Sequence, residues 1–164
     1  ITAFESLTKH LFSKIKDIEL NDFPRMEYST AMKRYGSDKP DIRFGMEFVE
    51  LNDVTQGGDF DVFNSAELVI GINAKDCASY TRKQLDKLTD FVRRPQVGAK
   101  GMIYLRCNAD GALKSSVDKF YTQEDLRKWA DTAKMEAGDL LLILSGNEAE
   151  VQKQMNDLRL HMGD

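Results

Sequence analysis

Leu140-Leu141-Leu142-Ile143-Leu144 is a continuous apolar run near the end of the chain. A strand that is buried on both faces has this pattern, without polar alternation. We therefore expect this run to be the central strand of a sheet. Asp110-Gly111 predicts a tight turn that pairs the segments on either side of it as a hairpin. Further strands are predicted at residues 60–63, 68–72, 102–107 and 113–117.

Helices are predicted around this sheet. Thr81 with Gln84, and Thr122 with Asp125, are capping-box pairs that indicate where two of them begin, and Asn147 with Glu150 is expected to cap the last helix. Strands mixed with separated helices indicate an α+β fold. The predicted helices cover residues 2–18, 28–35, 81–94, 122–133 and the segment from 147 to the end.

The composition excludes some functions. The chain has 164 residues and a net charge of −4, so it has no overall basic field for nucleic acid, although a local one remains open. No apolar run approaches the ~20 residues that span a bilayer, and no membrane partner is expected. Residues 1–20 alternate apolar and charged groups, unlike a signal peptide.

Both ends of the chain have apolar stripes at helical spacing. The chain also begins without Met, so we expect a fragment of a longer protein, the alternative being a processed small protein. The stripes are Phe4, Leu7, Leu11, Ile15 and Ile18 at the start, and Val151, Met155, Leu158 and Met162 at the end.

The cysteines and histidines give weak signals. Cys77 and Cys107 form no CxxC pair, so reduced thiols of a cytosolic protein are favoured over a disulfide or redox pair. His10 and His161 lie near opposite ends, and packed or surface roles are favoured over catalysis or metal binding.

A polar loop around Pro40 is the first candidate site. Ser37, Asp38, Lys39 and Arg43 gather there on a rigid turn, as functional loops often do. The equally open alternative is a self-satisfied loop in which Asp38 or Asp41 bonds nearby N–H groups.

A basic stretch from residue 80 to 106 is the second candidate. Arg82 and Lys83 stand at the start of a predicted helix, where cations oppose the helix dipole. A sequence that tolerates them is compatible with a positive binding face, although a solvated basic face is the commoner cause. Arg93, Arg94 and Lys100 extend this stretch. No catalytic or metal-binding motif is present, so no catalytic, metal or cofactor residue is predicted.

The polar loop also carries a family resemblance. Arg34-Tyr35-Gly36-Ser37-Asp38-Lys39-Pro40-Asp41 closely resembles bacterial-type aspartyl-tRNA synthetases. The resemblance covers essentially the whole chain, in order. Its segments are residues 23–28, 31–46, 80–86, 97–104, 115–120, 138–141 and 158–160.

The resemblance implies a layout. In this family a class II catalytic domain is interrupted by an α+β insert, the GAD domain, here expected at 47–145 with a mixed or antiparallel sheet. Residues 1–46 and 146–164 would then be flanking catalytic-domain segments. The enzyme resembled uses ATP and magnesium to activate aspartate and transfers it to tRNA, and it is expected to be cytoplasmic and homodimeric. Its ATP and aspartate residues would lie outside this chain, which alone is expected to be inactive.

Three roles remain open for the chain itself. The first is an accessory tRNA contact through the two candidate sites, with cations binding phosphates. The second is a structural insert that braces the catalytic domain. The third is the GAD domain of a tRNA-dependent amidotransferase B subunit, against which the synthetase-type segment before residue 47 argues. The residues of the tRNA hypothesis are Ser37, Asp38, Lys39, Arg43, Arg82, Lys83, Arg93, Arg94 and Lys100.

Overall fold

A five-stranded sheet forms the centre of the computed structural model, which describes residues 1–163. The strand order is β1-β2-β5-β3-β4, and every pairing is antiparallel. The apolar run predicted to be central is β5, and the α+β class is confirmed. The strands are β1 (Val49–Glu50), β2 (Leu68–Ala74), β3 (Ile103–Cys107), β4 (Leu113–Ser115) and β5 (Leu140–Gly146).

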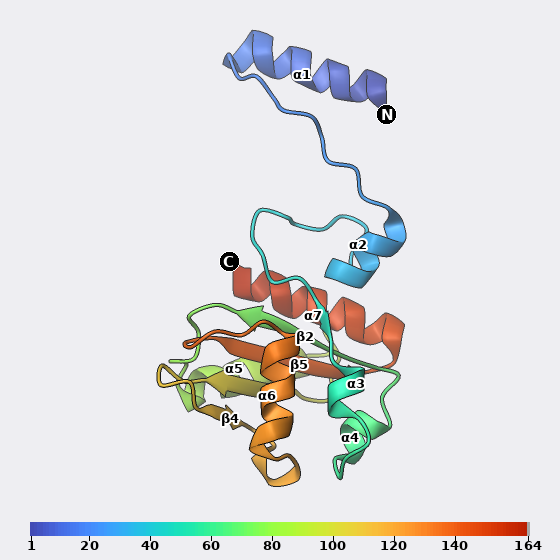
Figure 1. Cartoon of the computed structure of the whole chain (residues 1–164). Helices are drawn as coiled ribbons and strands as arrows, with labels where there is room; N and C mark the ends of the chain where they lie inside the picture. Colours follow the sequence, from blue (N-terminus) through green and yellow to red (C-terminus); the bar gives the residue numbers. More distant parts are fainter. Residues whose placement is uncertain (164) are drawn as a thin grey trace.

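Helices pack on both faces of this sheet (Figure 1). Within residues 1–163, no helix combines the length and the apolar character needed to cross a membrane. The helices are α1 (Thr2–Lys16), α2 (Tyr28–Tyr35), α3 (Asn52–Thr55), α4 (Asp61–Asn64), α5 (Arg82–Arg93), the 3-10 turn η1 (Asp118–Phe120), α6 (Gln123–Thr132) and α7 (Glu148–Gly163).

The side chains of β5 divide the interior into two cores. Leu141 and Ile143 face α3, α4 and α6, where Trp129 is fully buried. Leu140, Leu142 and Leu144 face α5 and α7. Because successive side chains of a strand point to opposite faces, an uninterrupted apolar strand is required to fill both cores.

The predicted helix starts are confirmed at α5, α6 and α7, since α7 begins at Glu148, directly after Asn147, but the expected Asn147–Glu150 cap is replaced by another partner. Thr81 with Gln84, and Thr122 with Asp125, form complete capping boxes. At α7, Glu67 takes the capping role instead. Its Oε2 accepts hydrogen bonds from Asn147 Nδ2 (2.6 Å) and from the backbone N–H of Glu148 (3.1 Å). A partner 80 residues away in sequence is invisible to a local motif.

The strand predicted at residues 60–63 is wrong, because Asp61–Asn64 form the short helix α4. Phe60 and Phe63 are three residues apart, which places both on one face of a helix. Their rings pack at 5.0 Å, and Phe63 is fully buried, while Val62 between them is exposed. The spacing of the two aromatic residues was the helical signal, and the apolar-polar alternation was misleading.

The two terminal stripes have different environments. Helix α1 stands apart from the rest of the chain, joined to it by an extended segment (Figure 1), and Phe4 is 75% exposed. In contrast, Val151, Met155 and Leu158 of α7 are fully buried against the sheet and α5. The last helix is therefore part of the sheet's own core, whereas α1 leaves its apolar stripe uncovered among the described residues.

A buried arginine fastens the segment before the sheet to α7. The side chain of Arg159 is fully buried, and its guanidinium donates to four backbone carbonyls. The acceptors are Asp41 (2.8 Å), Phe44 (3.1 Å), Gly45 (2.9 Å) and Met46 (3.1 Å). We call this arrangement the Arg159 clamp, and residues 37–46 the flank loop. A planar fork of donors suits such convergent acceptors.

Aromatic rings and a close backbone contact complete the attachment of this segment. The guanidinium of Arg159 lies over the rings of Phe44 and Tyr35, 4.3 and 4.8 Å from their centroids. Gly36 ends α2 with φ +67°, and a Cβ there would lie 2.1 Å from the carbonyl oxygen of Gln152 in α7. Only glycine fits both the left-handed conformation and this close approach.

A second buried charge, Asp139, lies directly before the start of β5. Its carboxylate accepts from the backbone N–H of Glu136 (2.8 Å), Lys75 Nζ (2.9 Å) and Asn73 Nδ2 (3.0 Å). The N–H of Asp76 donates to it at 3.3 Å. Burial opposes ionisation, but these donors outweigh it and lower the pKa of Asp139 below its usual value. The turn before β5 is thereby held to the end of β2.

Replacing Asp139 by Asn should lower the free energy of unfolding by about 2 kcal/mol, because hydrogen bonds to a charged group are lost. Since the folded-state pKa is lowered, this contribution is present above the unfolded pKa of about 3.9 and disappears as pH falls through the folded value. Urea titrations between neutral and acidic pH measure it. The wild type should lose more stability than Asp139→Asn on acidification, and parallel losses would contradict this role.

Replacing Arg159 by Met should lower the free energy of unfolding by about 3 kcal/mol, because buried carbonyls lose charged donors. Arg159→Lys should be nearly as costly, since an ammonium cannot reproduce the fork. Thermal and urea unfolding measure both. Arg82→Met is the matched control, because Arg82 is exposed and, within residues 1–163, its ion pair is the i, i+4 contact with Asp86, worth about 0.5 kcal/mol. Equal effects of Arg159→Met and Arg82→Met would refute the clamp.

Candidate functional site

Several polar and charged groups of the flank loop bond one another. Ser37 Oγ accepts from the backbone N–H of Lys39 (3.1 Å), and Asp41 Oδ1 accepts from the N–H of Arg43 (3.0 Å). The Arg43 guanidinium also bonds the Asp41 carboxylate and lowers the pKa of Asp41 to about 2. Asp38 and Lys39 are exposed. The loop therefore satisfies Asp41 internally, as the alternative reading predicted, and presents Lys39 to solvent.

The loop lies against α7 on one side. Ser37 and Asp38 border a shallow hollow of about 400 Å³, whose other wall includes Lys153 and Asn156 of α7. The Arg159 clamp holds the following residues on the same helix. The position of the candidate residues is therefore fixed by α7, which is distant in sequence.

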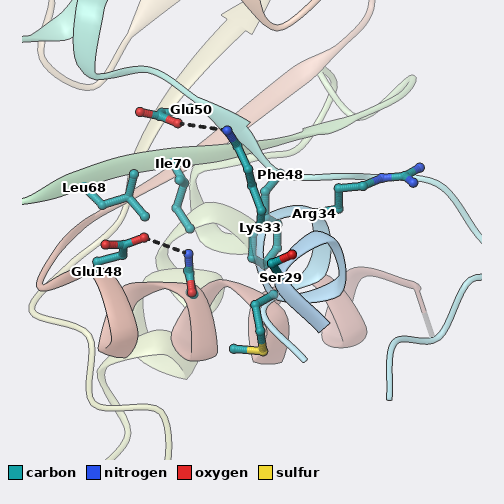
Figure 2. Close-up of a pocket in the computed structure, with 10 residues that line it drawn as sticks. Ser29, Lys33, Arg34, Phe48, Glu50, Leu68, Ile70 and Glu148 are labelled. Atoms are coloured by element: carbon teal, nitrogen blue, oxygen red, sulfur yellow. Dashed lines mark hydrogen bonds and ion pairs between the residues drawn. The ribbon is translucent and has the colours of Figure 1, made fainter. Parts of the chain in front are cut away.

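A groove between α2, β2 and α7 is lined by charged groups that have partners within the chain (Figure 2). Its apolar floor includes Phe48, Leu68 and Ile70, and its volume is about 480 Å³. Figure 2 shows Lys33 directed at Glu50, a pair separated by 4.0 Å.

The charged groups at the end of α2 are also paired. Arg34 forms a bidentate pair with Glu47, and this hydrogen bonding lowers the pKa of the Glu47 carboxyl. With these ion pairs made, the cations of the groove in Figure 2 are neutralised, and the carboxylate of Glu148 accepts a hydrogen bond from Gln152 at 3.5 Å.

The basic residues of α5 divide between its two ends. Arg82 and Lys83 are exposed in the first turn, and Arg82 lies 3.8 Å from Asp86. Arg93 and Arg94 stand at the other end, about 16 Å away at 1.5 Å per residue. The structure therefore does not gather all the predicted cations into one patch.

Arg93 and Lys100 are brought together at the C-terminal end of α5. Arg93 Nε donates to the backbone carbonyl of Lys100 at 3.1 Å. Both residues line a cavity at the end of the sheet, beside Met102 and Ile103. Of the nine residues of the tRNA hypothesis, these two alone share that cavity.

The histidines and cysteines considered from the sequence do not form a site among the described residues. His161 stacks on Phe91 with ring centroids 4.1 Å apart, and Cys77 and Cys107 are free thiols. His10 is exposed on α1. Among residues 1–163, no group of three or more His, Cys, Asp or Glu side chains is placed to hold a metal ion.

Arg159 is the residue that sequence reasoning missed. It lies four residues after Met155 and eight after Val151, so it belongs to the buried face of α7. The sequence signal of a buried arginine was its position on an otherwise apolar helical face. What it binds could not be read from that spacing, because the acceptors lie 113 to 118 residues away in sequence.

Comparison with known proteins agrees with this architecture. Residues 61–155 match the family described as GAD domain. The chain is 57% identical over 163 residues to an aspartate–tRNA ligase of Azobacteroides pseudotrichonymphae, and 58% identical over 166 residues to one of Bacteroides fragilis. The first match covers 99% of this chain and the second 100%, but each covers only 28% of the relative.

These findings confirm the resemblance to bacterial aspartyl-tRNA synthetases that the sequence indicated. The family match begins in α4, continues through the sheet and ends in α7, and it takes in more than half of the chain. It therefore includes most of the elements that build the two cores, and on this basis the chain belongs to the GAD domain family.

Proposed function

We propose that this chain is part of an aspartate–tRNA ligase, which uses ATP and magnesium to activate aspartate and transfers it to tRNA. The observation that carries the proposal is the 57–58% identity to such ligases over 99–100% of the chain, including the segments on both sides of the sheet. The ligase is proposed to be cytoplasmic and homodimeric. The exposed apolar stripe of α1 supports a larger assembly, because a further part of the ligase would cover it.

Within that ligase the chain is proposed to be non-catalytic. The proposed division assigns 47–145 to the insert and 1–46 and 146–164 to the flanks of the catalytic domain. Helix α7 of the second flank contributes to the core of the insert, and the Arg159 clamp joins it to the first flank. ATP, aspartate and magnesium would be bound by residues outside this chain.

The similarity of the first flank favours a ligase over an amidotransferase subunit. The match to the ligases includes the flank loop and α2, which precede the GAD match at residue 61. An amidotransferase would share only the insert. The alternative therefore leaves residues 1–46 without an explanation.

The proposed role of the chain in the ligase is an accessory contact with tRNA. Lys39 offers an exposed ammonium on a loop that the Arg159 clamp holds in place. Arg82, Lys83, Arg93 and Arg94 are exposed along α5 and would add a sequence-independent attraction to phosphates.

A purely structural insert is the second candidate. The specific observation in its favour is that Arg43 and Arg34 already bond carboxylates, with Asp41 and Glu47 as partners. Charges committed to such pairs gain less from a phosphate, since the pair must be given up. In this case the clamp would serve only to brace the two flanks against the sheet.

The ligase assignment predicts that this chain can replace the matching region of the Bacteroides fragilis ligase, to which it is 58% identical. The chimera should form aspartyl-adenylate and aspartylate tRNA-Asp, because the active-site residues come from the host. Radiolabelled aspartate transfer measures this. The chain alone should show no transfer, and a folded, ATP-binding chimera without transfer would count against the assignment.

The tRNA contact predicts salt-dependent binding of tRNA-Asp by the whole chain between about 50 and 200 mM salt. Lys39→Glu should weaken it and reduce the slope of log K against log salt by about 1, because one phosphate contact is lost. Fluorescence anisotropy measures both quantities.

Lys114→Glu is the matched control for this titration, since Lys114 is exposed on the edge strand β4. It should leave the affinity unchanged. Equal weakening by both variants would indicate only a general charge effect. No binding by the wild type at low salt would leave the structural insert as the function of this chain.

A further inference from the structure

A cavity of about 500 Å³ lies at the end of the sheet where β5 ends and β3 begins. Its apolar floor includes Phe60, Met102, Ile103 and Ile143. Its size is within the range of ligand-binding sites, which are mostly apolar with a few polar groups that orient the ligand. We call it the sheet-end cavity.

Two cations without carboxylate partners line this cavity. Neither Arg93 nor Lys100 forms an ion pair within residues 1–163. The Arg93 Nε bond to the Lys100 carbonyl fixes the guanidinium, and its Nη2 lies beside Gly101, 3.5 Å from where a Cβ would stand. A guanidinium fixed at the cavity, with the exposed Lys100 as a second cation lining it, suits a phosphate group.

The carboxylate at the cavity does not neutralise these cations. Glu67 lines the same cavity, but its Oε2 is bonded to the side chain of Asn147 and the N–H of Glu148 at the start of α7. Because this carboxylate is bonded at the helix terminus, where a negative charge is favourable, it does not pair with Arg93 or Lys100, which remain available for an anion.

The floor of the cavity suits a planar aromatic group. The ring of Phe60 is fixed by Phe63 and Phe120, with centroids 5.0 and 4.9 Å away. Val62, which also lines the cavity, is 53% exposed, so apolar surface is left for a ligand to cover. Bases of single-stranded nucleic acid stack on such aromatic surfaces beside a basic groove.

We propose that the sheet-end cavity binds one nucleotide of an RNA strand, with the base on the Phe60 floor and a phosphate between Arg93 and Lys100. The inference rests on the proposed function, which supplies RNA as the partner. In this proposal Arg93 and Lys100 differ in role from the other candidate residues for tRNA binding. Arg93 and Lys100 contact a defined nucleotide, whereas Arg82 and Lys83 add only a general attraction to phosphates.

The test is a titration of the whole chain with AMP, CMP, GMP and UMP, and then with a short single-stranded RNA, followed by amide chemical shifts. Adenosine and inorganic phosphate are the partial probes. Nucleotides and RNA should shift the amides of Gly101, Met102 and Ser145. Either partial probe should bind at least about tenfold more weakly than the nucleotides, because each makes only half of the contacts.

Two variants connect the binding to the cavity. Lys100→Glu and Val62→Asp each place a negative charge at the cavity, and both positions are exposed, so folding should be retained. Each should weaken nucleotide binding at least about tenfold. Lys87→Glu, an exposed residue of α5 outside the cavity, is the matched control and should have little effect.

The proposal fails if inorganic phosphate binds as well as the nucleotides and Val62→Asp has no effect, since the base would then have no site. It also fails if mononucleotides bind but the RNA does not. If no probe shifts the cavity amides while tRNA still binds in the salt titration, the cavity is excluded and the accessory tRNA contact stands.

Discussion

The buried guanidinium of Arg159 is the constraint on which the placement of the flank loop depends. A buried charge is costly unless its hydrogen bonds are satisfied. Here Nε and Nη2 donate to four carbonyls from residues 41–46 and two aromatic faces cover the guanidinium, while Nη1 has no hydrogen-bond partner among the described residues. This segment must therefore follow one path across α7. Burial lowers the pKa of Arg159, but an arginine keeps its charge at any physiological pH. The clamp therefore does not switch off with pH.

Because α7 also fills the core beneath the sheet, the clamp joins three regions that are distant in sequence. Residues 28–46 precede the sheet, α7 follows it, and both pack together on one side. In the proposed ligase this means that the insert and its two flanks behave as one folded body. Helix α1 is the exception, since it lies beyond an extended segment with its apolar stripe exposed (Figure 1).

Much of the fold could be predicted because its signals are local. The apolar run of β5, the capping boxes of α5 and α6 and the stripe of α7 each depend on neighbouring residues. The failures depend on distant contacts. Residues 61–64 form a helix whose Phe63, with the preceding Phe60, packs into an aromatic cluster with η1 and α6, and α7 is capped by Glu67. At the candidate site, the residue types were predictable, but not that Arg43 pairs with Asp41 or that Arg93 meets Lys100.

Native-state hydrogen exchange of the whole chain tests most directly whether the flank and the sheet form one folded body. The amides of Gly36 and Phe48 are bonded to the carbonyls of Met32 and Arg34. They should be protected to a degree that approaches the amides of β5, whereas α1 should exchange rapidly because none of its described side chains is buried. If residues 28–48 exchange as fast as α1, the clamp does not hold the flank loop, and this account of the structure is wrong.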